Sequence, residues 1–357
     1  MTRFAFVIHP LEPADVGRKY PIARYLPGPV VEAVMARTPS KMVSPITGVR
    51  SATGAQTEGW FVGCPLTSRQ LLNGDPNRAI AKIVQAVRVA QDLGAAVVGL
   101  GAFTSVIGDG GRQVAEQVEI AVTTGNSYTV ATAIEGTLRA AELMAIDPAA
   151  ATAAVVGATG SIGRVCAHLL APQVPRLILV GRRADALRQV ADELSGMGAQ
   201  VEVSMAPAES IPRADLIVTV TSALEAVIEP EMLRPGAVVC DVARPRDVSV
   251  QVAAKRDDVL VIEGGAVAVP GDVQFNFDFG FPPRTAYACM AETMILALED
   301  RPESYSLGKR LELSRVQEIS ALAAKHGFRL AGFRSFERTV EPAAIERIRQ
   351  RAGLQVA

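Results

Sequence analysis

The chain has 357 residues and a mass of 37.6 kDa, which is enough for two or three domains. Its 36 Lys and Arg residues nearly balance 37 Asp and Glu residues, so the composition excludes a highly charged partner such as nucleic acid for the chain as a whole. Hydrophobic residues make up 49% of the chain but aromatic residues only 5%, which favours an α/β protein with buried parallel sheets over an aromatic-rich β-sandwich.

The sequence predicts neither a membrane span nor a metal site. Its longest uncharged stretches, residues 93–108 and 148–163, contain Gly, Ser, Thr or Pro and are too short to cross a bilayer. The first ten residues have the pattern of a strand rather than of a signal peptide. The four cysteines and three histidines lie far apart without metal-ligand spacing, and we expect a reducing, cytoplasmic location.

The first third of the chain has the pattern of an α/β domain. Residues 4–8 predict a first strand, and a helical pattern at 78–94 leads into the apolar run 95–101, as in one half of a parallel α/β unit. The polar segment Thr123-Thr-Gly-Asn126 precedes a long predicted helix, for which Asn126 is a suitable N-cap. Asp147-Pro148 ends that helix, because proline disfavours helical geometry in the residue before it.

From residue 151 the pattern changes to a regular alternation of apolar strands and helices, which is typical of a doubly wound parallel sheet. Toward the C-terminus only helices are expected. The expected strands cover residues 152–157, 177–180, 201–204, 215–220, 237–241 and 259–263, and the clearest helices cover 161–170, 184–194, 284–300, 311–326 and 342–352.

The glycine pattern at residues 157, 160 and 163 predicts a dinucleotide site, because it follows an apolar strand and begins a helix. The first glycine permits a tight turn, the second lets the backbone approach a pyrophosphate, and the third lets helix and strand pack closely. The helix N-terminus also attracts phosphate charge. The candidate cofactor contacts are Gly157, Ala158, Thr159, Gly160, Ser161, Ile162 and Gly163.

The residues at the end of the second strand favour NADPH over NADH. An NAD-binding domain usually has Asp or Glu there, but this chain has Arg182 and Arg183. Two guanidinium groups suit a 2′-phosphate, although these arginines would also suit the start of a solvated helix. Thr221 and Ser222 are further candidates, either for cofactor contact or for ordinary loop capping. We therefore expect an α/β substrate-binding domain over 1–130, a Rossmann NADP(H)-binding domain over 131–280 and a helical C-terminal region over 281–357.

Cys289 is the candidate nucleophile. It lies shortly after Pro282-Pro283, which suit a helix start, so we expect it one or two turns into a new helix. The positive end of that helix and Arg284 would favour a thiolate, but from position alone a buried, inert cysteine is the commoner outcome. The remaining candidates have less support: Cys64, Cys166, Cys240, His9, His168 and His326.

Several segments are similar to those of one known family. The most specific are Thr123-Thr-Gly-Asn-Ser-Tyr-Thr129 and Tyr287-Ala-Cys-Met-Ala-Glu-Thr-Met294. Residues 58–62, 100–105, 157–163 and 263–265 match as well. On these segments the chain resembles the long-chain acyl-acyl-carrier-protein reductases, which form fatty aldehydes. The similarity is good from about residue 40 to about residue 330 and poor at both ends.

The resemblance implies a reductase that uses NADPH and a covalent acyl-enzyme. In this family the cysteine of the Ala-Cys-x-Ala-Glu segment takes the acyl group from the carrier's thioester, which implies that role for Cys289. The tetrahedral oxyanion needs hydrogen-bond donors, for which we select Thr124 and Asn126. The implied acyl donor is an acyl carrier protein or acyl-CoA. A weak association with membranes, through release of the aldehyde, stays open.

Two features allow more than one interpretation. Four phenylalanines alternate between residues 275 and 281, and they would either wall an acyl tunnel or form one core face of a strand. Cyanobacterial members of the family differ in this stretch. Residues 301–357 carry eleven Lys and Arg residues against six Glu residues, which suits either the steering of an acidic carrier or a solvated terminal helix.

Two alternative functions are considered. Residues 241–247, Asp-Val-Ala-Arg-Pro-Arg-Asp, resemble part of the Rossmann domain of shikimate dehydrogenases and glutamyl-tRNA reductases. An NADP-dependent dehydrogenase acting on a different carbonyl substrate is therefore one alternative. A non-enzymatic regulator that binds NADP(H) is the other, and it would need no reactive thiol.

Overall fold

The chain forms two compact units, described here from a computed structural model of residues 1–354. Unit 1 comprises Met1–Tyr128 and Val267–Arg329. Unit 2 comprises Thr129–Ala266 and the described residues from Leu330 onward. Each unit has its own six-stranded sheet.

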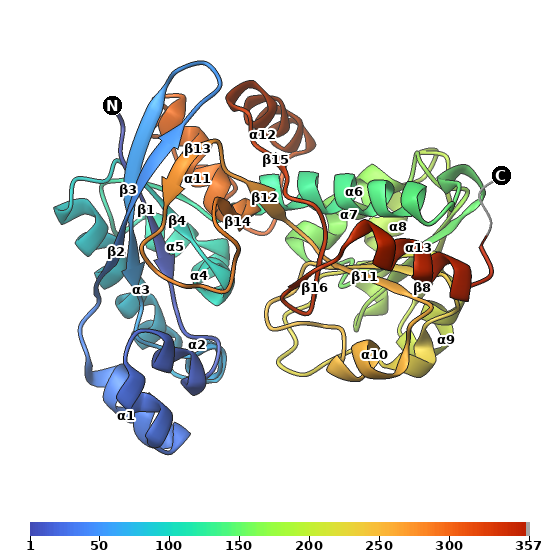
Figure 1. Cartoon of the computed structure of the whole chain (residues 1–357), viewed down its shortest axis with the longest axis horizontal. Helices are drawn as coiled ribbons and strands as arrows, with labels where there is room; N and C mark the ends of the chain where they lie inside the picture. Colours follow the sequence, from blue (N-terminus) through green and yellow to red (C-terminus); the bar gives the residue numbers. More distant parts are fainter. Residues whose placement is uncertain (355–357) are drawn as a thin grey trace. The chain divides into compact units, whose positions relative to one another are not determined.

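This grouping differs from the expected division at residues 130 and 280. The physical reason is that the chain returns to the first sheet after leaving unit 2: strand β13 (Gly271–Gln274) pairs with β2 (Lys41–Arg50), and helix α11 (Ala288–Leu298) packs on β4 (Val97–Leu100) (Figure 1). The segment that carries Cys289 is therefore part of unit 1.

The sheet of unit 1 is mainly parallel. Its strand order is β13-β2-β3-β1-β4-β5, in which β3, β1, β4 and β5 run parallel and β2 is antiparallel to β3. The central strands β1 and β4 consist of apolar residues or glycine and are almost entirely buried, as a strand covered on both faces requires. The remaining strand bounds in this sheet are β1 Phe4–Ile8, β3 Gln56–Gly63 and β5 Ala121–Thr123.

Gly99 lets helix α11 lie close to the middle of this sheet. A Cβ at Gly99 would lie 2.2 Å from Oγ1 of Thr293 and 2.5 Å from a ring carbon of Phe6. The helices of unit 1 are η1 Pro13–Arg18, η2 Pro21–Tyr25, α1 Gly28–Arg37, α2 Ser68–Asn73, α3 Pro76–Asp92, η3 Ala102–Ser105, α4 Ile107–Gly110, α5 Arg112–Ala115, α11 and α12 Leu313–His326.

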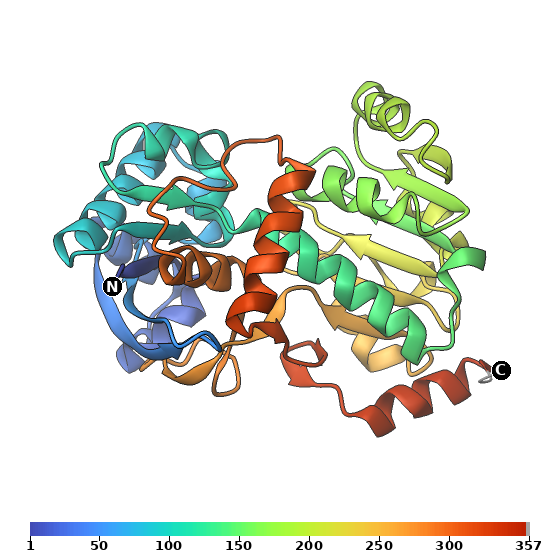
Figure 2. The ribbon, with the colours of Figure 1, turned by 90° about the horizontal axis from the view of Figure 1, so that it is seen from above.

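The sheet of unit 2 is entirely parallel, with strand order β11-β10-β9-β6-β7-β8 (Figures 1 and 2). The order reverses between β6 and β9, which is the topological switch point of a doubly wound fold. Helices α6 and α7 lie on one face and α10 on the other (Figure 1). The strands are β6 Thr152–Val156, β7 Arg176–Val180, β8 Gln200–Ser204, β9 Leu216–Thr219, β10 Val238–Asp241 and β11 Leu260–Glu263.

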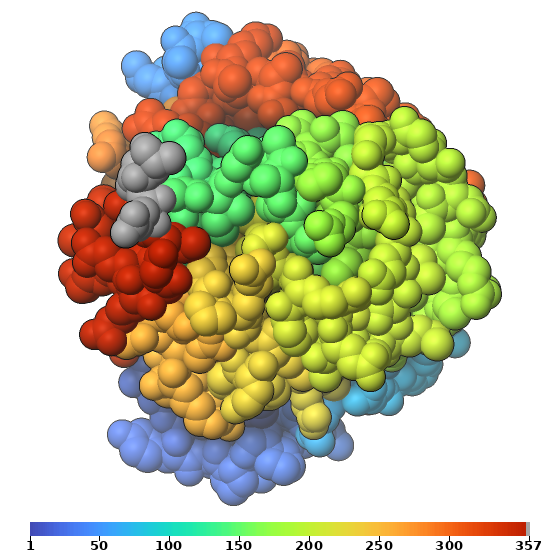
Figure 3. Space-filling model, turned by 90° about the vertical axis from the view of Figure 1, so that its right-hand side faces the viewer, coloured from blue at the N-terminus to red at the C-terminus, as the bar shows by residue number. Residues whose placement is uncertain are grey.

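The C-terminal helix α13 (Pro342–Arg351), drawn in dark red, lies on the surface of unit 2 (Figure 3), where Arg351 pairs with Asp257 at 2.6 Å. The other helices of this part of the chain are α6 Asn126–Leu143, η4 Pro148–Ala150, α7 Ser161–Leu170, α8 Ala184–Glu193, α9 Pro207–Ser210, η5 Ile211–Arg213, η6 Pro230–Met232 and α10 Val250–Lys255. The remaining short strands are β12 Ala266–Ala268, β14 Thr285–Tyr287, β15 Arg329–Leu330, β16 Arg334–Ser335 and β17 Arg338–Thr339.

The predicted α/β fold class, with a Rossmann domain and a helical C-terminal region, is confirmed. The helix expected over residues 284–300 begins later, at Ala288, because residues 285–287 form strand β14 beside β12. Cys289 is therefore the second residue of α11, whereas the sequence placed it one or two turns inside a helix. No helix among residues 1–354 is both long and apolar enough to cross a membrane.

The close contact at Gly99 predicts a large effect of a single methyl group. We expect Gly99→Ala to lower the free energy of unfolding by about 1–3 kcal/mol, because the added methyl displaces α11 from the sheet. Urea unfolding followed by circular dichroism measures the change.

Gly136→Ala is the matched control. Gly136 lies in α6, and its nearest neighbour to an added Cβ is Ile262 at 3.6 Å, so this substitution should be neutral or slightly stabilising. Equal effects of the two substitutions would contradict the packing argument.

Candidate functional site

The glycine-rich turn of unit 2 connects β6 to α7 and leaves backbone N–H groups for an anion. Gly157 has φ +85°, and a Cβ there would lie 2.4 Å from the carbonyl oxygen of Val220. A Cβ at Gly163 would lie 2.3 Å from the carbonyl oxygen of Gly157. The N-cap of α7 is Gly160, so no side chain caps the first turn of the helix. This cradle fits a dinucleotide pyrophosphate.

The predicted cofactor contacts around this turn differ in exposure. Gly160 is exposed at the tip, while Ala158 and Gly163 are buried beneath it. The partly exposed residues are Gly157, Thr159, Ser161 and Ile162.

Arg182 and Arg183 follow the end of β7, and both are exposed. Among residues 1–354 no carboxylate forms an ion pair with either of them. Both guanidinium groups are therefore available to a 2′-phosphate. This arrangement fits NADPH, and unit 2 is the part of the protein that uses it.

Thr221 is held by a residue that the sequence did not single out. Asp247, which is buried, accepts hydrogen bonds from the Thr221 N–H at 2.8 Å, from the Thr221 hydroxyl and from the Thr219 hydroxyl at 2.6 Å. Thr221 thus caps its own loop through Asp247, while Ser222 is exposed beside it. As cofactor contacts, both residues stay predictions.

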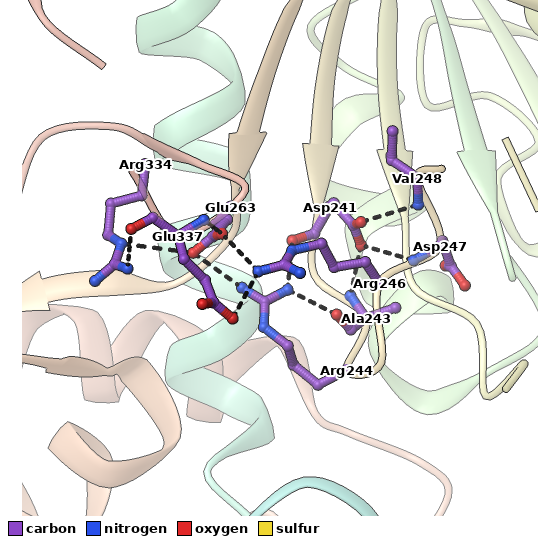
Figure 4. Close-up of polar contacts among 9 residues, drawn as sticks. All are labelled: Asp241, Ala243, Arg244, Arg246, Asp247, Val248, Glu263, Arg334 and Glu337. Carbon is purple, nitrogen blue, oxygen red and sulfur yellow. Dashed lines mark hydrogen bonds and ion pairs between the residues drawn. The ribbon is translucent and has the colours of Figure 1, made fainter. Parts of the chain in front are cut away.

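The loop after β10 is organised by two buried carboxylates (Figure 4). Asp241 accepts hydrogen bonds from the N–H groups of Ala243 at 3.1 Å and Val248 at 3.0 Å, and burial raises its pKa to about 6. Glu263, at the end of β11, pairs with arginines of this loop and of β16, and it accepts a hydrogen bond from the Glu337 N–H at 2.6 Å. These arginines are Arg244, Arg246 and Arg334.

In unit 1 the candidate nucleophile Cys289 lies at the start of α11, against the turn that follows β5. A Cβ at Gly125 would lie 2.2 Å from both Cα and Cβ of Cys289, and Gly125 has φ +71°. Only glycine allows this contact. Cys289 is partly exposed, and its place in the first turn of a helix favours negative charge on its sulfur. Arg284, which was expected to assist, is instead exposed and pairs with Asp272 at 3.6 Å.

Glu292 lies one helical turn after Cys289. It holds the segment after β5 in place from the interior of unit 1. Its carboxylate is fully buried and accepts hydrogen bonds from the Thr123 hydroxyl and, at 2.9 Å, from the Tyr128 N–H. Burial raises the pKa of Glu292, while these bonds and those from Ser306 and Gly125 act in the opposite direction. The sequence could have indicated this residue, because Glu292 is the one charged residue of the apolar helix α11.

The two predicted oxyanion donors differ in their surroundings. Thr124 is buried, and its hydroxyl donates to the carbonyl oxygen of Ser306 at 2.5 Å. Ser306 itself has φ +52°, and its hydroxyl oxygen lies 2.7 Å from that of Ser127. Asn126 is partly exposed at the start of α6, next to the glycine that touches Cys289. Both donor assignments stay predictions.

The other cysteines have the character of core residues. Burial raises the pKa of Cys64 and of Cys240 to about 12 and also raises that of Cys166. Among the four cysteines of the chain, Cys289 is the one that solvent reaches.

His9 contacts the backbone through both of its ring nitrogens. Its Nδ1 lies 3.0 Å from the carbonyl oxygen of Pro10, and its Nε2 accepts a hydrogen bond from the Phe103 N–H at 3.2 Å. Burial lowers its pKa to about 4. The neutral ring therefore ties the end of β1 to the segment after β4.

An aromatic strip leads from the sheet of unit 1 toward Cys289. Ring centroids are 5.3 Å apart for Phe61 and Phe279, 5.6 Å for Phe279 and Phe281, and 4.3 Å for Phe281 and Tyr287. Phe61 is buried, whereas the other three are partly exposed. The strip also includes Phe275 and Phe277.

The chain is similar to a known family model and to two known proteins. A family model described as shikimate/quinate 5-dehydrogenase matches residues 139–263. The long-chain acyl-[acyl-carrier-protein] reductase of Synechococcus elongatus is 32% identical over 305 residues, which cover 81% of this chain and 87% of that protein. The aminotransferase PigE of Serratia sp. is 36% identical over 287 residues, which cover 78% of this chain but only 33% of that longer protein.

Solved structures show weaker likenesses. A dipicolinate synthase chain from Bacillus halodurans is 17% identical, with a TM-score of 0.34, over 46% of this chain and 57% of that chain. The nucleotide-binding domain of glutamyl-tRNA reductase from Thermoplasma volcanium is 18% identical, with a TM-score of 0.27, over 37% of this chain and 84% of that chain.

The exposed arginines after β7 predict that their removal will weaken the preference for NADPH over NADH. We expect the double variant Arg182→Ser/Arg183→Ser to bind NADPH about 10- to 100-fold more weakly, because two charge-assisted contacts to the 2′-phosphate are lost. Binding of NADH should stay within about twofold. Titration of reduced-cofactor fluorescence measures both, with Arg188→Ser on α8 as the control. An equal loss for the two cofactors would contradict the assignment.

The partly buried, neutral His9 predicts a pH dependence of stability. Between pH 6.5 and pH 4 the unfolded chain takes up a proton on His9 that the folded chain does not, so stability falls as the pH falls through this range. We expect His9 to contribute about 2 kcal/mol of the loss between pH 7 and pH 5. His9→Gln keeps an acceptor for the Phe103 N–H and should remove that contribution in urea unfolding.

His168→Gln is the control for this measurement, because His168 is a partly exposed histidine of unit 2. It should retain the contribution of His9 to the loss between pH 7 and pH 5. A wild-type dependence in His9→Gln would show that His9 titrates normally in the folded chain.

Proposed function

Because the chain belongs to the family of the long-chain acyl-[acyl-carrier-protein] reductase, and is an oxidoreductase with a Rossmann domain that uses NADPH, we propose that it reduces a fatty acyl thioester to a fatty aldehyde. The acyl donor is an acyl carrier protein or coenzyme A. The observation that carries the proposal is the place of Cys289, solvent-accessible in the first turn of α11 and packed against Gly125.

Cys289 accepts the acyl group. Attack of its thiolate on the thioester carbonyl carbon forms a new C–S bond. The bond to the carrier's sulfur then breaks, and that sulfur leaves as a thiol after taking up the proton that Cys289 gave up. When bound, NADPH supplies the hydride that brings the carbonyl carbon to the aldehyde level. The C–S bond to Cys289 then breaks, its electron pair returns to the sulfur, and the aldehyde leaves.

The turn after β5 supplies the surroundings for the developing oxyanion. Of the two predicted donors, Asn126 suits this role better, because it is partly exposed and follows the residue that touches Cys289. The hydroxyl of Thr124 is directed to the Ser306 carbonyl, so Thr124 supports the shape of the turn.

The aromatic strip is suited to the acyl chain. Phe279, Phe281 and Tyr287 offer partly exposed apolar surface in a continuous row, and Tyr287 is two residues before Cys289. Burying an acyl chain against these rings removes apolar surface from water. Of the two interpretations of the four phenylalanines, this one uses the rings that are not buried.

A dehydrogenase acting on another carbonyl substrate is the second candidate. The match of residues 139–263 to the shikimate/quinate 5-dehydrogenase model favours it, but the match concerns unit 2 alone. It provides no role for Cys289 or for the turn that holds it.

Intact-mass measurement tests the acyl-enzyme. The protein is mixed with palmitoyl-CoA or a palmitoylated acyl carrier protein in the absence of NADPH. We expect wild type and Cys64→Ala to gain the mass of one acyl group and Cys289→Ala to gain none. Addition of NADPH should discharge the acyl group as the aldehyde, and Cys289→Ala should lose at least about 1,000-fold in rate.

Cys64→Ala is the matched control, because the Cys64 thiol is buried in the same unit. If no variant gains mass over a range of chain lengths while NADPH still binds, the thioester proposal fails. The dehydrogenase and the non-enzymatic NADP(H)-binding regulator would then be the remaining accounts.

A further inference from the structure

A small helical module formed by residues 13–37 protrudes from unit 1, where α1 is drawn in blue (Figure 1). It comprises η1, η2 and α1, and it has its own core of Val16, Ala23 and Val31. Glu32 of α1 is buried, accepts a hydrogen bond from the Thr67 hydroxyl at 2.8 Å and pairs with Arg69. The module is therefore a fixed platform on unit 1.

The outer side of this module exposes an unusual amount of apolar surface. Of the twelve most exposed large apolar side chains among residues 1–354, five lie between residues 22 and 34. Tyr25 is 87% exposed and Ile22 72%; they are three residues apart in a 3-10 helix and so share one face. Concentrated apolar exposure marks an interaction surface. The N-terminal apolar patch consists of Ile22, Tyr25, Leu26, Val30 and Val34.

Basic residues outnumber acidic ones in the segment that carries this patch. Residues 13–41 contain five basic and two acidic residues, a net charge of +3. Both acidic residues are engaged within unit 1, since Asp15 pairs with Arg18 and Glu32 pairs with Arg69. An acidic partner would therefore meet a net positive charge on the same segment as the apolar patch. The basic rim consists of Arg18, Lys19, Arg24, Arg37 and Lys41, all exposed.

The module also lies beside the aromatic strip. Nη1 of Arg18 is 3.0 Å from the position of a Cβ on Gly280, which lies between Phe279 and Phe281. Phe281 contacts Tyr287, which is two residues before Cys289. A partner seated on the patch is thus placed next to the row of rings that leads to the nucleophile.

We infer that the N-terminal apolar patch and its basic rim form the surface on which an acidic acyl carrier protein docks. The inference rests on the proposed function and extends it by naming the docking surface. The basic rim attracts the acidic carrier, and the apolar patch gives the contact its short-range attraction.

Other occupants fit the surface less well. A membrane-bound amphipathic helix is rich in Lys and Arg on its polar face, whereas α1 has only Arg37. A second copy of the chain would bring two patches of like charge together. The basic C-terminal region is less suited to a carrier, because Arg334 is buried against Glu263 and Arg351 pairs with Asp257.

Binding of a fluorescently labelled carrier tests the inference. An acyl carrier protein labelled on its pantetheine thiol is titrated with the full chain, and anisotropy gives the Kd. We expect Arg24→Glu/Arg37→Glu to raise the Kd at least about tenfold and to weaken its dependence on salt. Tyr25→Ser/Val34→Ser should raise the Kd by a similar factor with the salt dependence unchanged.

Matched controls separate docking from general charge effects. Arg88→Glu/Arg188→Glu changes the net charge by the same amount at exposed positions outside the patch, and it should leave the Kd within about twofold. Reduction of palmitoyl-CoA, which brings no carrier surface, should also stay within about twofold in the patch variants. Reduction of the palmitoylated carrier should fall about tenfold in kcat/KM.

The possible results distinguish failure of the docking inference from failure of the proposed function. Equal carrier binding by wild type and the patch variants would overturn the inference. So would patch-dependent flotation with phosphatidylglycerol vesicles in the absence of carrier binding. If the carrier binds through the patch and neither thioester is reduced, docking is supported and the reductase proposal fails.

Discussion

The buried carboxylate of Glu292 is the interaction on which the Cys289 site depends. A carboxylate removed from water is strongly unfavourable unless hydrogen bonds compensate it, and here every named partner is a hydroxyl or a backbone N–H rather than a cation. These partners come from the turn after β5 and from Ser306, far apart in the sequence. The turn, helix α11 and the segment around Ser306 must therefore form together, and Gly125 is thereby held against Cys289.

The two units use the same principle with different groups. In each, polar residues follow the carboxyl ends of parallel strands, which is where doubly wound folds bind ligands. Unit 1 places a thiol and a buried carboxylate there, and unit 2 places a glycine turn and two arginines. In unit 2 the buried Asp241 and Asp247 shape the loops beside the cofactor turn, as Glu292 shapes the turn beside Cys289.

The features of the fold and site that depend on neighbouring residues could be predicted from the sequence, whereas those that depend on contacts between distant residues could not. The strands of unit 2 and helix α7 were predicted closely, because continuous apolar runs and the glycine pattern are local features. The start of α11 was missed because residues 285–287 pair with β12, a contact that no short window contains. Thr124 could not be judged, because its partner Ser306 lies 182 residues away. The proline-interrupted helical elements between residues 13 and 37 show no helical period.

The division of unit 1 between two stretches of chain determines the order in which the protein can assemble during synthesis. The first 128 residues emerge without α11, so the face of β4 that this helix covers stays open to water until unit 2 has been made. Unit 2 lies largely between the two stretches and lacks only its C-terminal part at that stage. Cys289 therefore reaches its site only after most of the nucleotide-binding unit has been synthesised. A chain that ended before α11 would expose the apolar face of β4 to water, where it could aggregate, and would lack the nucleophile.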